Sequence, residues 1–261
     1  CMKKFILLMV TVVIVLLDIT PSIAKADENN VDVIEEKEIS TVNNDGIDPL
    51  QARGLVFNAN WFFLKRTEFT RYEDNYQKNK KLEVNMGYIY GQNKCPNFYI
   101  GDSRMSKVGC EIAATYNALK LRGRTVPCAN IIRTFEKNGY LLTAGFHGSD
   151  PYAIGEYFEN NISVKCTKYT DFDNFKSRID KNVSSATMNV YIASVWNGDS
   201  VLDGLHTFAF YTRNNKLYVY NYEDNNTTTT TSTSINRLIN SKWFIVGYYV
   251  PDMGRRIRRV D

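Results

Sequence analysis

The feature of this sequence that most constrains its fold is a change of hydrophobic period in its second half. Between Cys110 and Ile179 the apolar residues recur at helical spacing, whereas from Val190 to Val250 they form alternating β-branched and aromatic runs. Helices followed by an antiparallel sheet are the pattern of an α+β domain. We therefore predict an α+β fold in which a helical half packs on an antiparallel sheet.

Four helices and four strands are predicted from this spacing. The helices are expected over residues 110–121, 130–137, 152–158 and 171–179. Gly123 and Gly139 are placed to end the first two, while Asp150-Pro151 and Thr170 are placed to begin the last two. The strands are expected over residues 190–196, 205–211, 217–222 and 243–250.

Residues 2–26 have the three-part layout of a secretory signal peptide. Two lysines give a basic start, and the apolar run 5–17 is 13 residues long. That run is shorter than the ~20 residues needed to cross a bilayer. Residues 24–26, Ala-Lys-Ala, supply a small-x-small cleavage site. We therefore expect a secreted protein, either extracellular or associated with the cell wall.

Charge is balanced overall but unevenly distributed. The 261-residue chain has 32 basic and 28 acidic residues, a balance without the concentrated basic stripe of a nucleic-acid-binding protein. Residues 27–49 hold eight acidic residues and one base, which predicts an acidic linker or pro-segment and leaves 50–261 as the folded domain. The arginine-rich cluster 255–259 could touch an anionic wall or lipid surface, although a solvated basic terminus is the simpler explanation.

Export would place the chain where disulfides are permitted, so Cys95, Cys110, Cys128 and Cys166 could form pairs. A core of this size does not need disulfide staples, and we expect no essential disulfide framework. None of the cysteines lies in a CxxC sequence, and the chain has two histidines. A zinc site is therefore not expected.

Cys110 is the first candidate for chemistry. It begins the predicted helix 110–121, where unpaired backbone N–H groups and the positive end of the helix dipole favour thiolate over thiol. A small buried structural cysteine is the alternative explanation. A Cys–His mechanism would use either His206, within a predicted strand, or His147, in a glycine-flanked loop that holds a base less rigidly. We rank His206 first.

The hairpin predicted after His206 brings further polar residues near the ring. A two-residue turn at 214–215 would make His206 face Glu223 on the next strand. Asn221 would then lie diagonal to His206 on the same face, whereas Asp224 would point to the opposite face. Asn221 or Glu223 is therefore predicted to orient the imidazole, and Asp224 is disfavoured.

These residues resemble a known family. The chain is similar, over roughly residues 86–222, to papain-like cysteine peptidases related to the double-glycine, bacteriocin-processing peptidases. The resemblance is carried by Tyr90-Gly91-Gln92-Asn93, Gly109-Cys110, Leu205-His206-Thr207 and Tyr218-Val219-Tyr220-Asn221. In that family the order along the chain is glutamine, cysteine at a helix start, histidine on a strand, and Asp or Asn on the next strand.

The resemblance implies a papain-like fold and a role for each matching residue. Gln92 would be the oxyanion-hole glutamine, Cys110 the nucleophile, His206 the general base and Asn221 the residue that orients the base. The chain departs from its relatives at Glu111, where they commonly have glycine. It also departs at Arg104, where many of them place the glutamine.

The mechanism implied by the resemblance is acyl transfer through a thioester, starting from a Cys110 thiolate paired with protonated His206. It requires no metal or organic cofactor. The leading hypothesis is a secreted hydrolase, a cysteine peptidase or amidase, acting on a peptide or cell-wall peptide. One alternative is an acyltransferase or transglutaminase-like enzyme on the same fold. Another is a catalytically inactive, wall-binding module.

The layout of residues 2–26 predicts that signal peptidase cuts after Ala26, because the small-x-small site follows a short apolar run. N-terminal sequencing of the secreted protein should therefore begin at Asp27. A mature protein that still contains residues 5–17 would show that this segment is not removed.

Overall fold

The computed structural model describes residues 68–84, 86–199 and 204–254, which belong to one unit, Asn43–Asp261. The predicted signal peptide, the acidic linker and the arginine-rich cluster lie outside the described residues. Within these residues, no helix is long and apolar enough to cross a membrane.

The chain forms helices first and a sheet second, so the predicted α+β class is confirmed. The helices are α3 (Glu68–Leu82), α4 (Met105–Val108), α5 (Cys110–Leu121), α6 (Cys128–Lys137), α7 (Ala153–Tyr157) and α8 (Phe172–Asn182). The strands are β1 (Tyr99–Ile100), β2 (Ser103–Arg104), β3 (Thr167–Tyr169), β4 (Asn189–Trp196), β5 (Leu205–Arg213), β6 (Lys216–Tyr220), β7 (Thr230–Ser232) and β8 (Phe244–Val250).

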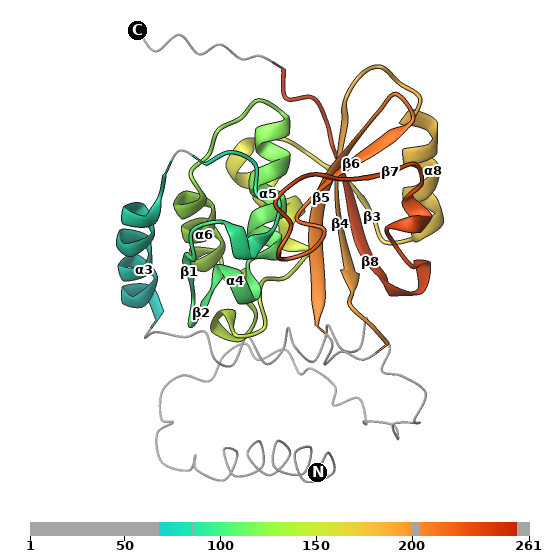
Figure 1. Cartoon of the computed structure of the whole chain (residues 1–261). Coiled ribbons are helices and arrows are strands. Elements are labelled where there is room, and N and C mark those ends of the chain that lie inside the picture. Colours follow the sequence, from blue (N-terminus) through green and yellow to red (C-terminus); the bar gives the residue numbers. More distant parts are fainter. Residues whose placement is uncertain (1–67, 85, 200–203, 255–261) are drawn as a thin grey trace, which may run out of the picture. The chain divides into compact units, whose positions relative to one another are not determined.

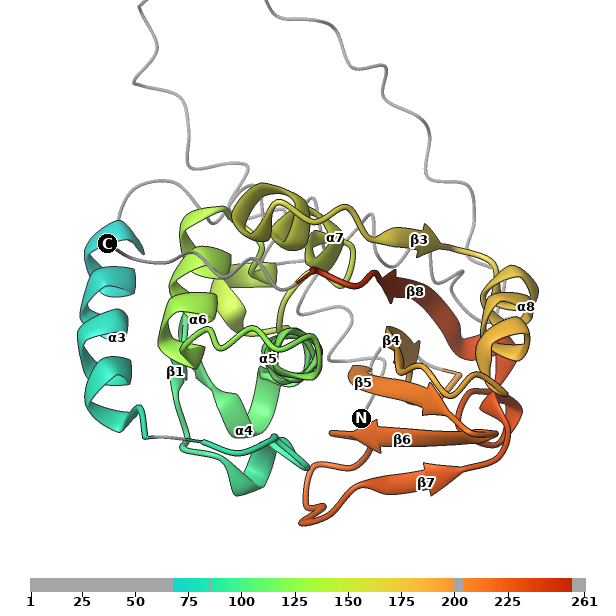
Figure 2. The ribbon, with the colours of Figure 1, turned by 90° about the horizontal axis from the view of Figure 1, so that it is seen from above.

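Six of these strands form one antiparallel sheet in the order β3-β8-β4-β5-β6-β7. Strands β4 and β5 pair over their whole common length, from Asn189↔Thr212 to Trp196↔Leu205. Helices α5 and α8 lie on opposite sides of this sheet (Figures 1 and 2). Strands β1 and β2 form a separate small hairpin.

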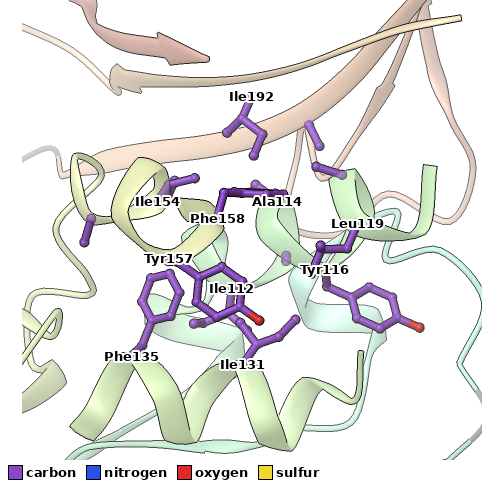
Figure 3. Close-up of a cluster of buried hydrophobic side chains, with 14 of the residues drawn as sticks. Ile112, Ala114, Tyr116, Leu119, Ile131, Phe135, Ile154, Tyr157, Phe158 and Ile192 are labelled. Atoms are coloured by element: carbon purple, nitrogen blue, oxygen red, sulfur yellow. The ribbon is translucent and has the colours of Figure 1, made fainter. Parts of the chain in front are cut away.

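Helix α5 is the centre of the larger core. Apart from Lys120, all of its side chains are buried. Ile112 and Leu119 pack with Ile131 and Phe135 of α6, and Ile192 of β4 reaches the same cluster from the sheet (Figure 3). A helix enclosed on several sides needs apolar or small residues around its circumference, and α5 has three alanines.

The other face of the sheet carries an aromatic core under α8. Phe175 of α8 packs edge-on against Tyr191 of β4 and Phe210 of β5, with ring centroids 6.0 and 6.2 Å apart. Gly247 of β8 allows this approach, because a Cβ atom there would lie 2.6 Å from the Phe175 ring. The sheet is therefore buried on both faces, which fixes its position between the helices.

The predicted elements are all present, with shifted ends. Asp171 rather than Thr170 is the N-cap of α8, because its carboxylate accepts the N–H of Asn174 at 2.9 Å. The polar run 225–231 ends in strand β7, since Thr230 pairs with Val219 of β6. Helix α7 begins at Ala153, later than predicted.

Helix α3 was not predicted because its sequence is mostly polar. Tyr72 joins the larger core, and two buried asparagines attach the helix to the β1–β2 hairpin. Asn79 exchanges hydrogen bonds with the backbone of Tyr99 at 2.8 and 2.9 Å. The Asn75 amide donates to the Gly101 carbonyl and to Glu136, each at 3.0 Å.

Glu136 is a buried carboxyl at this junction. Its Oε1 accepts the N–H of Gly101 at 2.9 Å, while its Oε2 is buried without a hydrogen-bond partner. Burial raises the pKa of Glu136 to about 7, against the effect of its hydrogen bonds with Asn75 and Gly101. The folded protein therefore retains a proton that the unfolded chain releases at lower pH.

This burial predicts that stability falls as pH rises from 5 to 8, because the folded state must release a proton from Glu136 that the unfolded state has already lost. In the Glu136→Gln variant that decrease should be smaller by roughly 3 kcal/mol. Urea denaturation at both pH values measures it. Glu156→Gln, at an exposed position of α7, controls for the loss of one acidic residue. An unchanged decrease in Glu136→Gln would contradict the prediction.

Candidate functional site

Cys110 is the first residue of α5, as the sequence predicts, and its residue exposure is 6%. Gly109 lies between α4 and α5 in a tight connection. A Cβ atom at Gly109 would lie 2.6 Å from the Met105 carbonyl oxygen and 2.3 Å from the Met105 sulfur. Glycine therefore lets the two helices follow one another directly and sets where the Cys110 side chain begins.

The Cys110 thiol lies at an edge of β5 that β6 leaves unpaired. Strand β6 ends at Tyr220, opposite Ala209, while β5 continues to Leu205. The Cys110 Sγ lies 4.0 Å from the Leu205 carbonyl oxygen. The Thr207 backbone also acts on the sulfur, because it lowers the pKa of the thiol. The sulfur thus lies beside the backbone on both sides of His206.

Asn221 ends β6 by turning the chain out of the sheet. Its φ is +58°, the left-handed conformation that asparagine tolerates better than most residues. Its backbone N–H donates to the Tyr90 carbonyl at 2.8 Å, and its side-chain amide donates to the Thr207 carbonyl at 3.2 Å. Asn221 therefore connects the β5–β6 hairpin to the chain before Gln92. It also supplies a hydrogen-bond donor to the Thr207 carbonyl, which has no strand partner at this edge of β5.

Asn221 meets His206 through its backbone rather than its side chain. The His206 Nε2 lies 2.5 Å from the Asn221 carbonyl oxygen. A carbonyl oxygen only accepts hydrogen bonds, so Nε2 carries the hydrogen and Nδ1 is the unprotonated nitrogen of the neutral ring. Burial lowers the pKa of His206, against the effects of the Asn221 carbonyl and Asp224. At neutral pH the ring is therefore a neutral base with its lone pair on Nδ1.

Asp224, which the sequence disfavoured, lies beside this ring, so that prediction is wrong. Asp224 Oδ1 lies 3.9 Å from His206 Nδ1, whereas no ion pair or hydrogen bond joins Glu223 to the ring in the described part of the chain. The predicted register is correct up to Ala209↔Tyr220. Beyond it the left-handed turn at Asn221 abolishes the alternation of faces on which the prediction depended.

The environment of Cys110 differs from the predicted thiolate–imidazolium pair. The titratable group in contact with Sγ is Glu111, whose Oε2 lies 3.3 Å away. Burial raises the pKa of the Cys110 thiol well above its ordinary value, and the charge of Glu111 raises it further. Desolvation thus outweighs the helix start, and the prediction of a low thiol pKa is wrong. No hydrogen bond joins Sγ to the His206 ring within the described residues.

Strand alternation explains why His206 and Glu111 approach the thiol from different sides. The Thr207 hydroxyl donates to Glu111 Oε1 at 3.2 Å, so Thr207 faces α5. His206 points to the opposite face, where its ring stacks on Phe208 with centroids 6.4 Å apart. The sulfur lies at the strand edge, between these two faces.

Gln92 is buried, with a residue exposure of 4%, in a short 3-10 helix, Gln92–Lys94. Its Nε2 donates to the Ser106 carbonyl of α4 at 3.2 Å, and its Oε1 is buried without a partner. The Asn93 N–H donates to the Asp224 carbonyl at 2.9 Å. The structure therefore places Gln92 between the helix that precedes Cys110 and the loop that carries Asp224.

His147, the second histidine, lies in a loop, as predicted. Its ring packs edge-on against Phe146 with centroids 5.0 Å apart. Burial lowers its pKa. The next residue, Gly148, borders Glu111, because a Cβ atom there would lie 3.8 Å from the Glu111 Oε2.

Glu111 stands out in the sequence as a departure from the family, but the sequence predicts neither a role for it nor its hydroxyl partners. Glu111 is fully buried, and Thr207 and Ser194 continue its hydrogen bonding, with their hydroxyl oxygens 2.9 Å apart. The signal that could have found Glu111 is an acidic residue in a helix whose other early residues are apolar or small. Such a carboxyl has to be buried with the helix.

Comparisons with known proteins give no relative for this chain: no protein-family model, curated protein or solved structure matches it. Across residues 68–84, 86–199 and 204–254, no group of three or more His, Cys, Asp or Glu side chains is arranged to hold a metal ion. The four cysteines in these ranges are free thiols.

The geometry of Asn221 predicts different costs for two substitutions. Asn221→Gly keeps the left-handed turn and loses the side-chain bond to Thr207, whereas Asn221→Ala also forces a Cβ-bearing residue into that conformation without a local hydrogen bond. We expect the alanine variant to be less stable than the glycine variant by about 1 kcal/mol. Urea denaturation of both proteins measures the difference. Equal stabilities would show that the left-handed turn costs alanine nothing here.

Proposed function

We propose that this protein is a secreted cysteine peptidase or amidase with a papain-like arrangement, hydrolysing peptide bonds in peptides or cell-wall peptides. One observation carries the proposal. The Cys110 thiol, at the start of a buried helix, lies against the backbone of β5 on both sides of a histidine. That histidine is oriented by a carbonyl on Nε2 and has a carboxylate near Nδ1.

The resting site holds a thiol and a neutral imidazole, so the proposed reaction begins with general-base catalysis. As the sulfur attacks the substrate carbonyl, its proton passes to His206 Nδ1, and the resulting imidazolium is stabilised by Asp224 and the Asn221 carbonyl. Transfer requires the ring and the sulfur to move into hydrogen-bond contact when substrate binds. Catalytic contacts of this kind are often long in proteins without substrate.

The tetrahedral intermediate would be stabilised by the backbone N–H of Cys110 and the side-chain amide of Gln92. In the resting protein the Gln92 amide donates to Ser106, so it would exchange that carbonyl for the oxyanion. His206 then gives its proton to the leaving amine, which produces a thioester on Cys110. Water, activated by the neutral ring, hydrolyses the thioester and restores the thiol.

A catalytically inactive binding module on the same fold is the second candidate. The observation that favours it is the buried thiol, which is held as a thiol by its surroundings and has no hydrogen bond to His206 in the described structure. The two proposals differ in whether Cys110 and His206 are required for turnover.

We expect Cys110→Ala and His206→Ala each to reduce peptide cleavage by at least ~10³-fold while the protein remains folded, because each removes a group that reacts. The assay incubates a mixture of synthetic peptides with the protein and identifies the products by mass spectrometry. Circular dichroism checks the fold. Cys166→Ala, a thiol with no assigned role in the site, is the matched control and should retain activity.

Two outcomes would change the conclusion. Full activity in Cys110→Ala would show that the cysteine is not the nucleophile, and absence of cleavage by the wild-type protein would favour the binding module. Adding glycinamide to the same assay identifies an acyltransferase, because the amine would then appear in the products in place of water.

A further inference from the structure

We infer that Glu111 is a positioning residue for the Cys110 nucleophile: it accepts the thiol hydrogen, holds the sulfur at the open edge of β5 and keeps it as a thiol in the resting protein. This inference rests on the proposed function of Cys110 as a nucleophile. Glu111 itself touches no substrate in this scheme, since it lies in the interior behind the sulfur.

The first support is the contact geometry. Glu111 Oε2 lies 3.3 Å from Cys110 Sγ, within the distance of a sulfur hydrogen bond. The carboxylate oxygen accepts and the S–H donates, which fixes the direction of the thiol hydrogen. The other acceptor near the sulfur, the Leu205 carbonyl oxygen, is more distant, at 4.0 Å from Sγ. Glu111 is therefore the nearer acceptor of the thiol hydrogen.

The second support is that the carboxylate itself is held in place. Thr207 donates to Glu111 Oε1 at 3.2 Å, and Ser194 on the paired position of β4 lies 2.9 Å from the Thr207 hydroxyl. Because Thr207 uses its hydrogen for Glu111, Ser194 is the donor in that second pair. Ser194, Thr207 and Glu111 are each completely buried. A chain of bonds from the sheet thus sets the orientation of the carboxyl and, through it, of the sulfur.

The third support is the charge around this cluster. Asp150, which precedes α7, is the further carboxylate that acts on Glu111, and the partners from the sheet are uncharged hydroxyls. Burial raises the pKa of Glu111 to about 7, and Asp150 adds to this effect. A negative charge on Glu111 opposes a second negative charge on the adjacent sulfur. An ionised Glu111 therefore favours the protonated form of the Cys110 thiol.

The test measures the thiol directly. Wild-type protein, Glu111→Gln and Thr115→Ala are treated with iodoacetamide at several pH values, and alkylation is followed on the tryptic peptide Val108–Lys120. That peptide contains Cys110 and no other cysteine. In Glu111→Gln the amide oxygen faces the Thr207 hydroxyl, so the NH₂ group faces Sγ and favours the thiolate. We expect alkylation at pH 7 at least ~10-fold faster than in wild type, with the pH profile shifted to lower pH.

Thr115→Ala is the matched control for loosened packing, because Thr115 is a fully buried residue of α5 whose hydroxyl has no hydrogen-bond partner among the described residues. Its alkylation at pH 7 should stay near the wild-type rate. If both variants react faster by the same factor, simple exposure explains the change and the inference is overturned. Unchanged alkylation of a folded Glu111→Gln variant would overturn it equally.

A wild-type measurement keeps the inference testable if Glu111→Gln does not fold. Alkylation of Cys110 in wild type should still be rising at pH 9, above the ~8.5 of a free cysteine, and a plateau near neutral pH would contradict the assigned role. Alkylation needs no peptide substrate, so its result is separate from the proposed function. Peptide cleavage abolished in Cys110→Ala supports the function, whereas the iodoacetamide profiles support or refute the role of Glu111.

Discussion

The open edge of β5 is the constraint on which the rest of the site depends. Strand β6 stops at Tyr220, so the backbone groups of β5 from Thr207 to Leu205 lose their strand partner. Buried N–H and C=O groups must find other partners. The Asn221 amide donates to the Thr207 carbonyl, and the Cys110 thiol lies 4.0 Å from the Leu205 carbonyl oxygen. The sulfur reaches this edge of β5 because Cys110 is the first residue of α5. The other residues of the candidate site lie around the sulfur.

Asn221, which follows the last residue of β6, connects the open edge of β5 to His206 and to the chain before Gln92. Its left-handed turn directs its N–H to Tyr90 and its carbonyl to His206. The turn also brings Asp224 against the chain around Gly91, where a Cβ atom would lie 2.5 Å from the Asp224 carbonyl oxygen. A short asparagine and a nearby glycine thus determine how the helical half and the sheet half meet at the candidate site.

Much of the fold could be predicted because the spacing of apolar residues along a short segment indicates whether it forms a helix or a strand. The helix that begins at Cys110 and the strand that contains His206 both lie where this spacing predicts them. Helix α3 could not, since its sequence is mostly polar and its attachment uses two buried asparagines as well as Tyr72. The proximity of Asp224 to His206 was missed because alternation along a strand is valid only until the strand ends. The contact of Glu111 with the thiol depends on how α5 packs against β5, which no local pattern contains.

The charge state of the site follows from the same burial. A resting thiolate–imidazolium pair would place two charges in an environment where Cys110 is almost completely enclosed, and the desolvation penalty is several kcal/mol per ion. Glu111 beside the sulfur adds a third ionisable group, whose negative charge would repel the thiolate. The neutral arrangement avoids these costs. In the proposed reaction, ionisation of the sulfur becomes favourable only when a substrate carbonyl accepts its electrons as the proton leaves for His206. Burial of the cysteine would therefore make the proposed enzyme inert at rest and reactive only toward a bound acyl group.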